Sequence, residues 1–291
     1  MSEYHSCCSR FLVTCWVVLS FLSIHSSAQA AIKTVIYPRP EADSDRRTEY
    51  PLKLLELALN TVNRDYMLMP SVVTLNQGRA LKELSQERTV DVVWSMTSVE
   101  REKELLPIRI PIYRGLIGWR LFLAKKSNLE TISAIKEPAQ LKDMRILQGH
   151  DWPDTEILKA NGFSVLGVVH YPAIFEMLQA GRGDLFPRSI IEIWAEAETY
   201  HDAGIVIEPN WMLRYPTAFY YFVARNNGAL ARDIETGLTM LVESGEFNQL
   251  FYHYYGGLLE SARIPERTVI ELNNPILPPD TPLGVEKFWH K

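Results

Sequence analysis

Hydrophobic and polar positions follow two periodicities in the first part of the chain. Three apolar runs have the length of strands: residues 32–37, 67–73 and 91–94. Two segments between them have helical spacing: residues 50–63 and 78–86. In the first of these segments, four apolar residues fall on one helical face: Leu52, Leu55, Leu59 and Val62. The order strand, helix, strand, helix, strand predicts an α/β fold with a parallel sheet.

A second α/β alternation lies between two extended apolar runs, residues 116–124 and 218–224. Its predicted strands and helices are residues 145–147, 156–160, 173–180, 184–186 and 190–200. This arrangement predicts a second lobe inserted into the first, with the two extended runs as the hinge. Two helices follow, with apolar stripes at Leu230, Ile234, Leu238 and Leu241 and at Phe247, Leu250, Phe251 and Tyr254. The Pro-rich residues 271–284 predict an extended strap.

The first 30 residues have the pattern of a cleavable secretory signal peptide. Arg10 precedes an apolar run at residues 11–24, and the segment ends on the small-x-small triplet of residues 28–30. The run is shorter than the ~20 residues of a membrane span, although a retained N-terminal anchor is the alternative. All three cysteines lie in this segment: Cys7, Cys8 and Cys15. The rest of the chain then has no disulfide and no cysteine chemistry, which fits a protein of the bacterial periplasm.

Composition excludes several classes of function. With 47% hydrophobic and 22% charged residues the chain is typical of a globular protein, and its length allows one large domain or two lobes. A formal charge of −5 argues against a nucleic-acid partner. We expect no metal and no cofactor, because no HExxH motif, G-x-S-x-G elbow or Gly-rich phosphate loop occurs. The histidines after residue 30 also lack ligand spacing: His150, His170, His201, His253 and His290.

The stretch from Asp91 to Gly115 is the first candidate binding site. Small polar side chains, among them Thr97 and Ser98, follow the strand that ends at Trp94, and Arg101 comes next. In α/β proteins ligands lie outside the carboxyl ends of the strands, so these residues are placed to hold a small ligand. The alternative is that Arg101 is a surface arginine among its glutamate neighbours.

The sequence GHDWPDT at residues 149–155 is the second candidate. It joins a strand to a helix, where free backbone amides bind anions, and Trp152 can pack over an apolar part of a ligand. The alternative is a turn capped by Asp151 or Asp154 with a structural tryptophan. Arg188 also follows a strand end, and two arginines in one cleft would favour an anionic ligand. Trp94 and Trp211 either line this cleft or belong to the core.

Three segments in order resemble the family 3 periplasmic solute-binding proteins, whose best-known members bind amino acids for ABC importers. Residues 78–113 are similar to the family's helix, D-x-x-x strand, T-x-x-R turn and F-S-x-P-Y run, and GRGDLF at 181–186 to its G-R-x-D-A strand start. Residues 228–256 resemble its paired C-terminal helices. The resemblance implies two α/β lobes joined by two extended hinge strands. The first lobe would be residues 31–116 with 222–291, and the second residues 117–221.

The resemblance also implies site residues. The family's carboxylate-binding arginine corresponds to Arg101, with Ser98 where threonine is usual, and the anion-holding helix start to residues 150–155. The aspartate that usually binds a ligand's amino group is replaced by Ser189, next to Arg188, and IRIPIY lacks the usual serine. An acidic or differently substituted ligand therefore fits at least as well as an α-amino acid.

Together these observations predict a periplasmic protein that binds a small polar, anionic solute in the cleft between the lobes. It would be a monomer that delivers the solute to an ABC-transporter permease or a membrane receptor. The predicted ligand-binding residues are Tyr37, Trp94, Thr97, Ser98, Arg101, His150, Asp151, Trp152, Arg188 and Ser189.

Two other functions stay open. The fold also hosts enzymes resembling cyclohexadienyl dehydratase, for which Glu192, Asp151 and His150 are the acid–base candidates. The second is a sensory module that acts through a separate membrane receptor.

Overall fold

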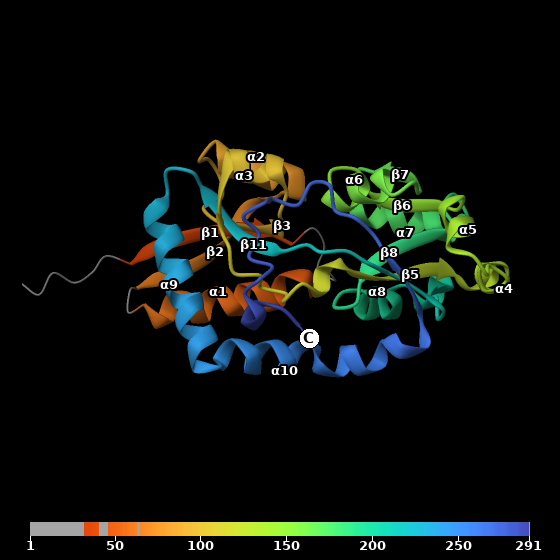
Figure 1. The fold of residues 1–291 in the computed structure, drawn as a ribbon. Helices are drawn as coiled ribbons and strands as arrows, with labels where there is room; N and C mark the ends of the chain where they lie inside the picture. The colour runs from red at the N-terminus through yellow and green to blue at the C-terminus, as the bar shows by residue number, and fades with distance from the viewer. Residues whose placement is uncertain (1–31, 41–45, 63–64, 291) are drawn as a thin grey trace, which may run out of the picture. The chain divides into compact units, whose positions relative to one another are not determined.

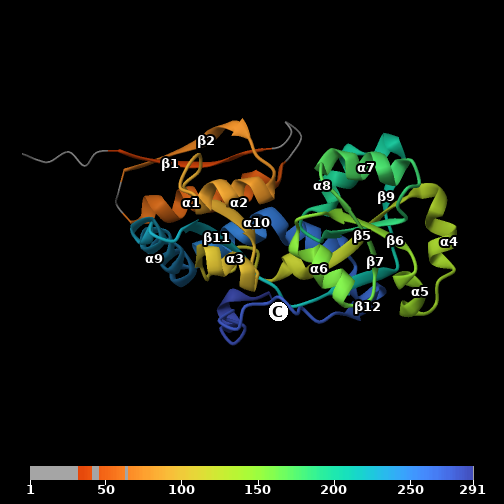
Figure 2. The ribbon, with the colours of Figure 1, turned by 90° about the horizontal axis from the view of Figure 1, so that it is seen from above.

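The computed structural model describes residues 32–40, 46–62 and 65–290, so the predicted signal peptide lies outside the described residues. Two α/β lobes lie side by side in Figures 1 and 2, with the strands of each flanked by helices. The α/β class predicted from the hydrophobic pattern is confirmed.

The first lobe contains two groups of strands. β1 (Lys33–Arg39) and β2 (Tyr66–Thr74) pair in parallel, whereas β3 (Val93–Met96) and β4 (Leu105–Ile108) flank β11 (Phe219–Ala224) in an antiparallel sheet. A hydrogen bond from the Asp91 amide to the Ile36 carbonyl, 2.8 Å long, joins the two groups. The helices of this lobe are α1 (Glu49–Thr61), α2 (Gln77–Ser85), α3 (Val99–Glu104) and α9 (Gly228–Ser244).

The second lobe has one mixed sheet in the strand order β12-β10-β5-β8-β6-β7, with β9 also paired to β5. β6 is parallel to β7 and β8, while β5 is antiparallel to β8 and β10. The strands are β5 (Trp119–Lys125), β6 (Arg145–Gly149), β7 (Ser164–Val168), β8 (Leu185–Ser189), β9 (Ile205–Ile207), β10 (Trp211–Arg214) and β12 (Thr268–Glu271). The helices are α4 (Leu129–Ser133), α5 (Pro138–Lys142), α6 (Pro153–Ala160), α7 (Tyr171–Gln179) and α8 (Ile193–Thr199).

The chain passes from one lobe to the other at two crossings, and these two segments lie next to each other at Gly118. The Tyr215 amide donates to the Gly118 carbonyl over 3.2 Å, and a Cβ on Gly118 would lie 2.2 Å from the Tyr215 carbonyl oxygen. Only glycine lets the two backbones approach this closely. Because β11 pairs with β3 and β4, the second crossing comes before Phe219, whereas the predicted lobe boundary at 221/222 falls inside β11.

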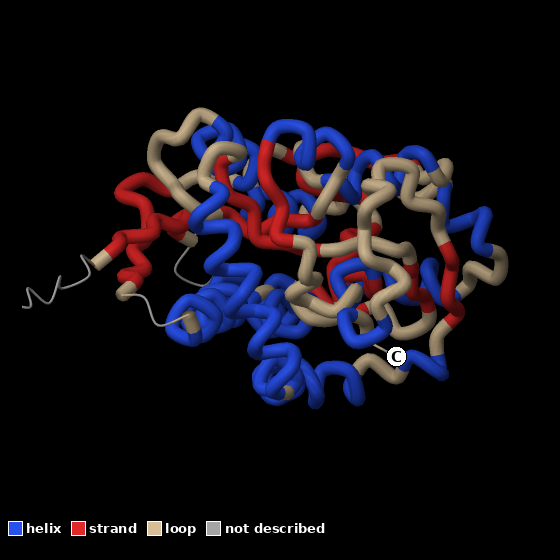
Figure 3. The backbone as a smooth tube through the Cα atoms, turned by 60° about the vertical axis from the view of Figure 1, so that its left-hand side comes forward, coloured by secondary structure: helices blue, strands red, loops and turns tan. Residues whose placement is uncertain are grey.

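The C-terminal part of the chain connects both lobes. In Figure 1, α10 (Glu246–Ser261) runs beneath the two lobes. β12 then pairs in parallel with β10 of the second lobe, and the Val99 amide of the first lobe donates to Ile276. Figure 3 shows most of the tail after β12 as loop. The sequence predicts that residues 222–291 belong to the first lobe. They are not confined to that lobe, because β12 completes the sheet of the second lobe.

The buried face of α1 differs slightly from its predicted face. Leu55 and Leu59 are buried as predicted, but Leu52 and Val62 are only partly buried. Tyr50, Leu54 and Ala58 complete the buried face, since α9 crosses α1 at Ala58. Tyr50, Leu54 and Ala58 are themselves spaced four residues apart, so the sequence also contained this second apolar stripe.

Candidate functional site

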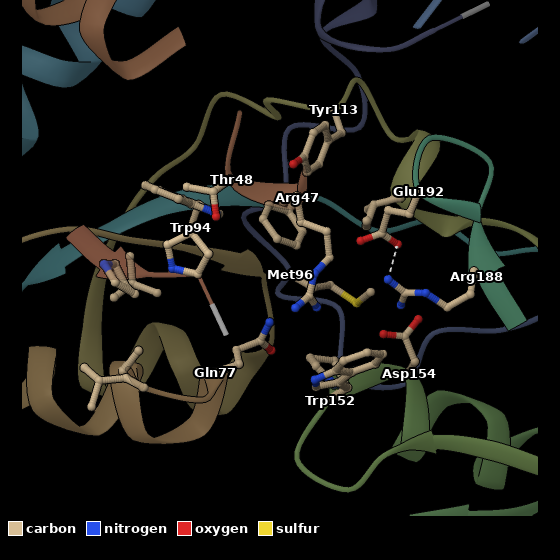
Figure 4. A pocket seen from close by; sticks show the side chains of 18 of the residues that line it. Arg47, Thr48, Gln77, Trp94, Met96, Tyr113, Trp152, Asp154, Arg188 and Glu192 are labelled. Atoms are coloured by element: carbon tan, nitrogen blue, oxygen red, sulfur yellow. Dashed lines mark ion pairs between the residues drawn. The ribbon is translucent and has the colours of Figure 1, made fainter. Parts of the chain in front are cut away.

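A cavity of about 110 Å³ lies between the two lobes (Figure 4). We call it the interlobe cavity. First-lobe residues on its walls include Arg39, Arg47, Gln77, Trp94, Met96, Tyr113 and Phe219, and second-lobe residues include Arg120, Trp152, Asp154, Arg188 and Glu192. The walls therefore combine aromatic rings with charged side chains from both lobes.

The aromatic walls come from strand ends and loops that meet at the hinge. Trp94 lies on β3, and its ring centroid is 5.9 Å from that of Tyr37. The ring centroid of Tyr113 is 5.0 Å from that of Phe219, at the start of β11. On the opposite lobe, Trp152 precedes α6. These rings surround a small apolar space, which suits the flat or apolar part of an organic ligand.

Arg188 organises the charged wall of the second lobe. It is almost completely buried, its Nε lies 2.8 and 2.9 Å from the two Glu196 carboxylate oxygens, and its Nη2 lies 3.1 Å from Glu192 Oε2. Burial by itself lowers the pKa of Arg188, but Glu192 and Glu196 outweigh burial and raise that pKa above its ordinary value. The Arg188 guanidinium also lies 4.9 Å from the Trp152 ring centroid, so it supports the aromatic wall.

A second buried pair continues this network towards the hinge. Arg120 Nη2 lies 2.5 Å from Asp154 Oδ1, and the Tyr215 hydroxyl donates to the same carboxylate. Arg120 Nη1 lies 3.6 Å from Glu192 Oε2. Among the described residues, no donor is aligned for a hydrogen bond with Glu192 Oε2. This oxygen is buried between the two arginines, Arg120 and Arg188.

The first lobe contributes two arginines to the cavity. Arg39 donates from Nε to the Ser71 carbonyl over 2.9 Å, and Figure 4 shows Arg47 extending into the cavity. The Arg47 guanidinium lies 4.1 Å from the ring centroid of Tyr171, on the second lobe. Arg120 and Arg188 are paired with second-lobe carboxylates, and Arg39 and Arg47 are the arginines that the first lobe adds to the described lining of the cavity.

Arg101 does not line the interlobe cavity. Its Nη1 donates to Ser95 Oγ and the Met96 carbonyl, at 2.6 and 2.8 Å, and its Nη2 to Gln77 Oε1 and the Asp151 carbonyl, at 2.9 and 3.1 Å. Burial lowers the pKa of Arg101 to about 10, against the opposing effect of Asp151, so the guanidinium stays charged at neutral pH. Its donors bind the protein, and one bond crosses between the lobes.

Asp151 forms a second hydrogen bond between the two lobes. The Gly78 amide, at the start of α2, donates to Asp151 Oδ2 over 2.8 Å. A carboxylate of the second lobe thus caps a helix of the first lobe, where the amide groups of a helix start attract anions. Ser98, Arg101, His150 and Asp151 all line an outer groove beside α2, α3 and α6.

The remaining predicted residues have partners within the protein. Thr97 is fully buried and donates to Glu102 over 2.6 Å, and Ser98 caps α3 by accepting from the Arg101 amide. Ser189 is fully buried and donates to the Leu116 carbonyl over 2.9 Å. Tyr37 is buried beside Trp94. Of the ten predicted residues, Trp94, Trp152 and Arg188 line the interlobe cavity.

Several cavity residues are missing from the set predicted from the sequence. Arg47 lies in a polar stretch before α1, and Tyr113 and Phe219 lie at the two hinge crossings, far apart in the chain. The sequence suggests Glu192 only as an acid–base candidate. A search for aromatic residues at the hinge ends would have found Tyr113 and Phe219, but nothing local marks Arg47.

The described residues contain no group of three or more His, Cys, Asp or Glu side chains arranged to hold a metal ion. Within the same residues, no helix is both long and apolar enough to cross a membrane.

Comparisons with known proteins identify the fold. No protein-family model matches the sequence, and no curated protein sequence matches it. An ancestral arginine-binding protein bound to arginine matches over 77% of this chain and 99% of its own, with 16% identity and a TM-score of 0.59. The arginine-, lysine-, histidine-binding protein ArtJ from Geobacillus stearothermophilus matches over 77% and 95%, with 14% identity and a TM-score of 0.57.

A third similar structure is a histidine kinase sensor domain with similarity to periplasmic binding proteins. It covers 78% of this chain and 96% of its own, with 14% identity and a TM-score of 0.56. The chain therefore has the two-lobed fold of the periplasmic binding proteins, and the fold implied by the sequence resemblance is confirmed.

Proposed function

We propose that this protein, with the fold of the two-lobed periplasmic binding proteins, binds a small anionic organic solute in the interlobe cavity. The observation that carries the proposal is a cavity lined from both lobes by aromatic rings and arginines. A ligand held there contacts both lobes at once, so its binding favours the closed arrangement, as in hinge closure around ligands.

The charge of the cavity walls supports an anionic ligand. Among the described residues, four arginines and two carboxylates line the cavity: Arg39, Arg47, Arg120, Arg188, Asp154 and Glu192. The compared proteins include binders of arginine, whereas here the second-lobe carboxylates are paired with arginines of the same lobe. We propose that the anionic group of the ligand faces Arg39 and Arg47, and that Trp94 and Trp152 enclose its apolar part.

This proposal assigns Arg101 a different role from the one predicted by the resemblance. Its guanidinium donates to four protein acceptors, including the Asp151 carbonyl of the other lobe. We propose that Arg101 holds the lobes together beside the cavity and that Arg47 takes its place as the cation facing the ligand.

Export through the predicted signal peptide and delivery of the solute to a membrane transporter or receptor complete the proposed function. The similarity to a histidine kinase sensor domain supports a sensing role as the second candidate. A pull-down of membrane proteins by ligand-loaded protein separates the two, since a permease indicates transport and a receptor kinase indicates sensing.

A thermal-shift screen of carboxylates, sugar acids and amino acids, followed by small-angle scattering with each hit, tests the binding function. We expect an anionic hit to raise the unfolding temperature and reduce the radius of gyration. Arg47→Gln should weaken that hit about tenfold, the usual effect of losing a charged hydrogen bond. Arg214→Gln is the matched control, because Arg214 pairs with Glu271 away from the cavity. Equal losses in the two variants would contradict the proposed site.

A further inference from the structure

A second cavity, of about 330 Å³, lies between the start of α1, α8 and α10. We call it the tyrosine cavity, because tyrosines dominate its wall. Its aromatic residues are Tyr50, Tyr113, Tyr171, Trp194, Tyr200, Tyr254 and Tyr255. It adjoins the interlobe cavity, with which it shares Arg47, Tyr113 and Glu192.

The tyrosines form a packed group whose hydroxyls partly bind the protein. The ring centroid of Tyr50 lies 5.4 Å from that of Tyr254 and 5.0 Å from that of Tyr255. The Tyr50 hydroxyl donates to the Ile112 carbonyl, and that of Tyr171 donates to Glu196. With these hydroxyls used inside the protein, the rings contribute their aromatic surface to the cavity. Such surface attracts cations through the ring quadrupole.

The structure already contains one cation on this wall. The Arg47 guanidinium lies 4.1 Å from the centroid of the Tyr171 ring. This distance is within the ~6 Å range of a cation–π interaction. The wall can therefore hold a positive charge against an aromatic face.

Carboxylates outnumber arginines on the described wall of the tyrosine cavity, in contrast to the interlobe cavity. Within the part of the chain that the structure describes, four glutamates and two arginines line it: Glu49, Glu192, Glu196, Glu198, Arg46 and Arg47. Arg46 is paired with Glu49 at 2.8 Å, and Arg188 is paired with Glu196 at 2.7 Å and with Glu192 at 3.1 Å. Glu198 is therefore the carboxylate of this wall without an ion pair among the described residues. A positively charged ligand would meet this carboxylate and an aromatic wall here.

We propose that the tyrosine cavity is a second binding site, which takes an organic cation with an alkylammonium group. The ammonium group lies against the ring of Tyr254 and pairs with Glu198, while Arg47 keeps its place over the Tyr171 ring. The proposal does not depend on which solute occupies the interlobe cavity. The group can belong to a free cation or to the end of a ligand whose other end lies in the interlobe cavity.

Calorimetry on the full chain with choline tests this site. Its neutral isostere, 3,3-dimethylbutan-1-ol, has the same shape without the charge. We expect choline to bind about tenfold more tightly than the alcohol, as a desolvated cation–π contact predicts. Equal binding of the two probes, or no binding of choline, would overturn the proposal.

Three variants of α10 locate the binding. Tyr254→Leu should weaken choline about tenfold, while Tyr254→Phe, which keeps the ring, should retain its affinity. Tyr252→Leu is the matched control, since Tyr252 lies on the same helix, is 43% exposed and does not line the cavity. If Tyr252→Leu weakens choline as much as Tyr254→Leu does, the site lies elsewhere and the proposal fails.

Trp152→Leu distinguishes a free cation from a ligand that spans both cavities. Trp152 lines the interlobe cavity and does not line the tyrosine cavity. A free cation such as choline should keep its affinity in this variant. 6-Aminohexanoic acid, which carries both charges, should lose affinity in Trp152→Leu and in Tyr254→Leu if one ligand spans both cavities. Either pattern supports the site. If Tyr254→Leu changes the binding of neither probe, the proposal is overturned.

Discussion

At the residue scale, Asp184 shows how one side chain connects a sequence motif to the fold. Its carboxylate accepts from the Arg145 amide at 2.8 Å and from Arg145 Nε and Nη2. These bonds link the residue before β8 to the first residue of β6. The hydrogen bonds from the Arg145 side chain lower the pKa of Asp184, and partial burial opposes them.

The lowered pKa predicts a pH-dependent contribution of Asp184 to stability. Because the folded-state pKa lies below the ordinary value of 3.8, the contribution is complete above that value and is lost as the pH falls through the folded-state pKa. Asp184→Asn should reduce the free energy of unfolding at neutral pH by about 0.5–1 kcal/mol, after allowing for exposure to solvent. Urea titrations at neutral pH and at about pH 3 should show the two proteins converging in acid. A constant difference would contradict this account.

At the element scale, the crossing of α1 and α9 requires a glycine. A Cβ on Gly237 would lie 1.9 Å from the Ala58 carbonyl oxygen, so the two helices pack with their backbones in near contact. Ala58 and Gly237 are buried, and Ile234 and Leu238 on the same face of α9 join the core. The close packing places α9 against β4 and β11, and Phe219 of β11 lines the interlobe cavity.

Gly237→Ala should destabilise the protein by about 1–3 kcal/mol, because the added methyl group overpacks against backbone that cannot move aside easily. The control is Gly257→Ala in α10, where no atom lies within 4 Å of the new Cβ. That substitution should stabilise by up to ~1 kcal/mol through helix propensity. Chemical denaturation of both variants measures the difference, and equal stabilities would show that the helices can separate.

At the scale of the whole molecule, bonds between the lobes hold the arrangement seen in Figures 1 and 2. Asp151 accepts from the Gly78 amide through its carboxylate and from Arg101 through its carbonyl, and Arg47 contacts Tyr171. Opening the lobes requires these contacts to break. Their loss should therefore affect the lobe arrangement more than the stability of each lobe.

Gly78→Ala tests this contact. The new Cβ would lie 2.3 Å from Asp151 Oδ2, the end of a flexible side chain, so the carboxylate must leave the Gly78 amide. We expect a larger radius of gyration in small-angle scattering without ligand, with little change in unfolding temperature. Gly284→Ala, whose Cβ would meet no atom within 4 Å, is the control. An unchanged radius in Gly78→Ala would mean that this bond does not hold the lobes.

Local patterns in the sequence were enough for much of the fold. Strand-length runs and helical spacing predict β1, β2, α1 and α2 closely, because each element buries a face whose period depends on its own backbone geometry. They do not predict that β3 pairs antiparallel with β11, or that β12 completes the second-lobe sheet. Those pairings join residues far apart in the chain, such as Met96 with Phe219 and Trp211 with Thr268, and no local period encodes them.

The site residues also divide into those that the local sequence indicates and those that only the fold brings together. Strand-end reasoning placed Trp94, Trp152 and Arg188 near a cleft, and all three line the interlobe cavity. The sequence by itself determined the α/β class, the two-lobed order of segments and these candidates, because each depends on local geometry. Only the tertiary structure decided that Arg101 bonds to Asp151 while Arg47 extends into the cavity. The partner of a buried charge depends on which lobe faces it, and that is settled only when the lobes meet.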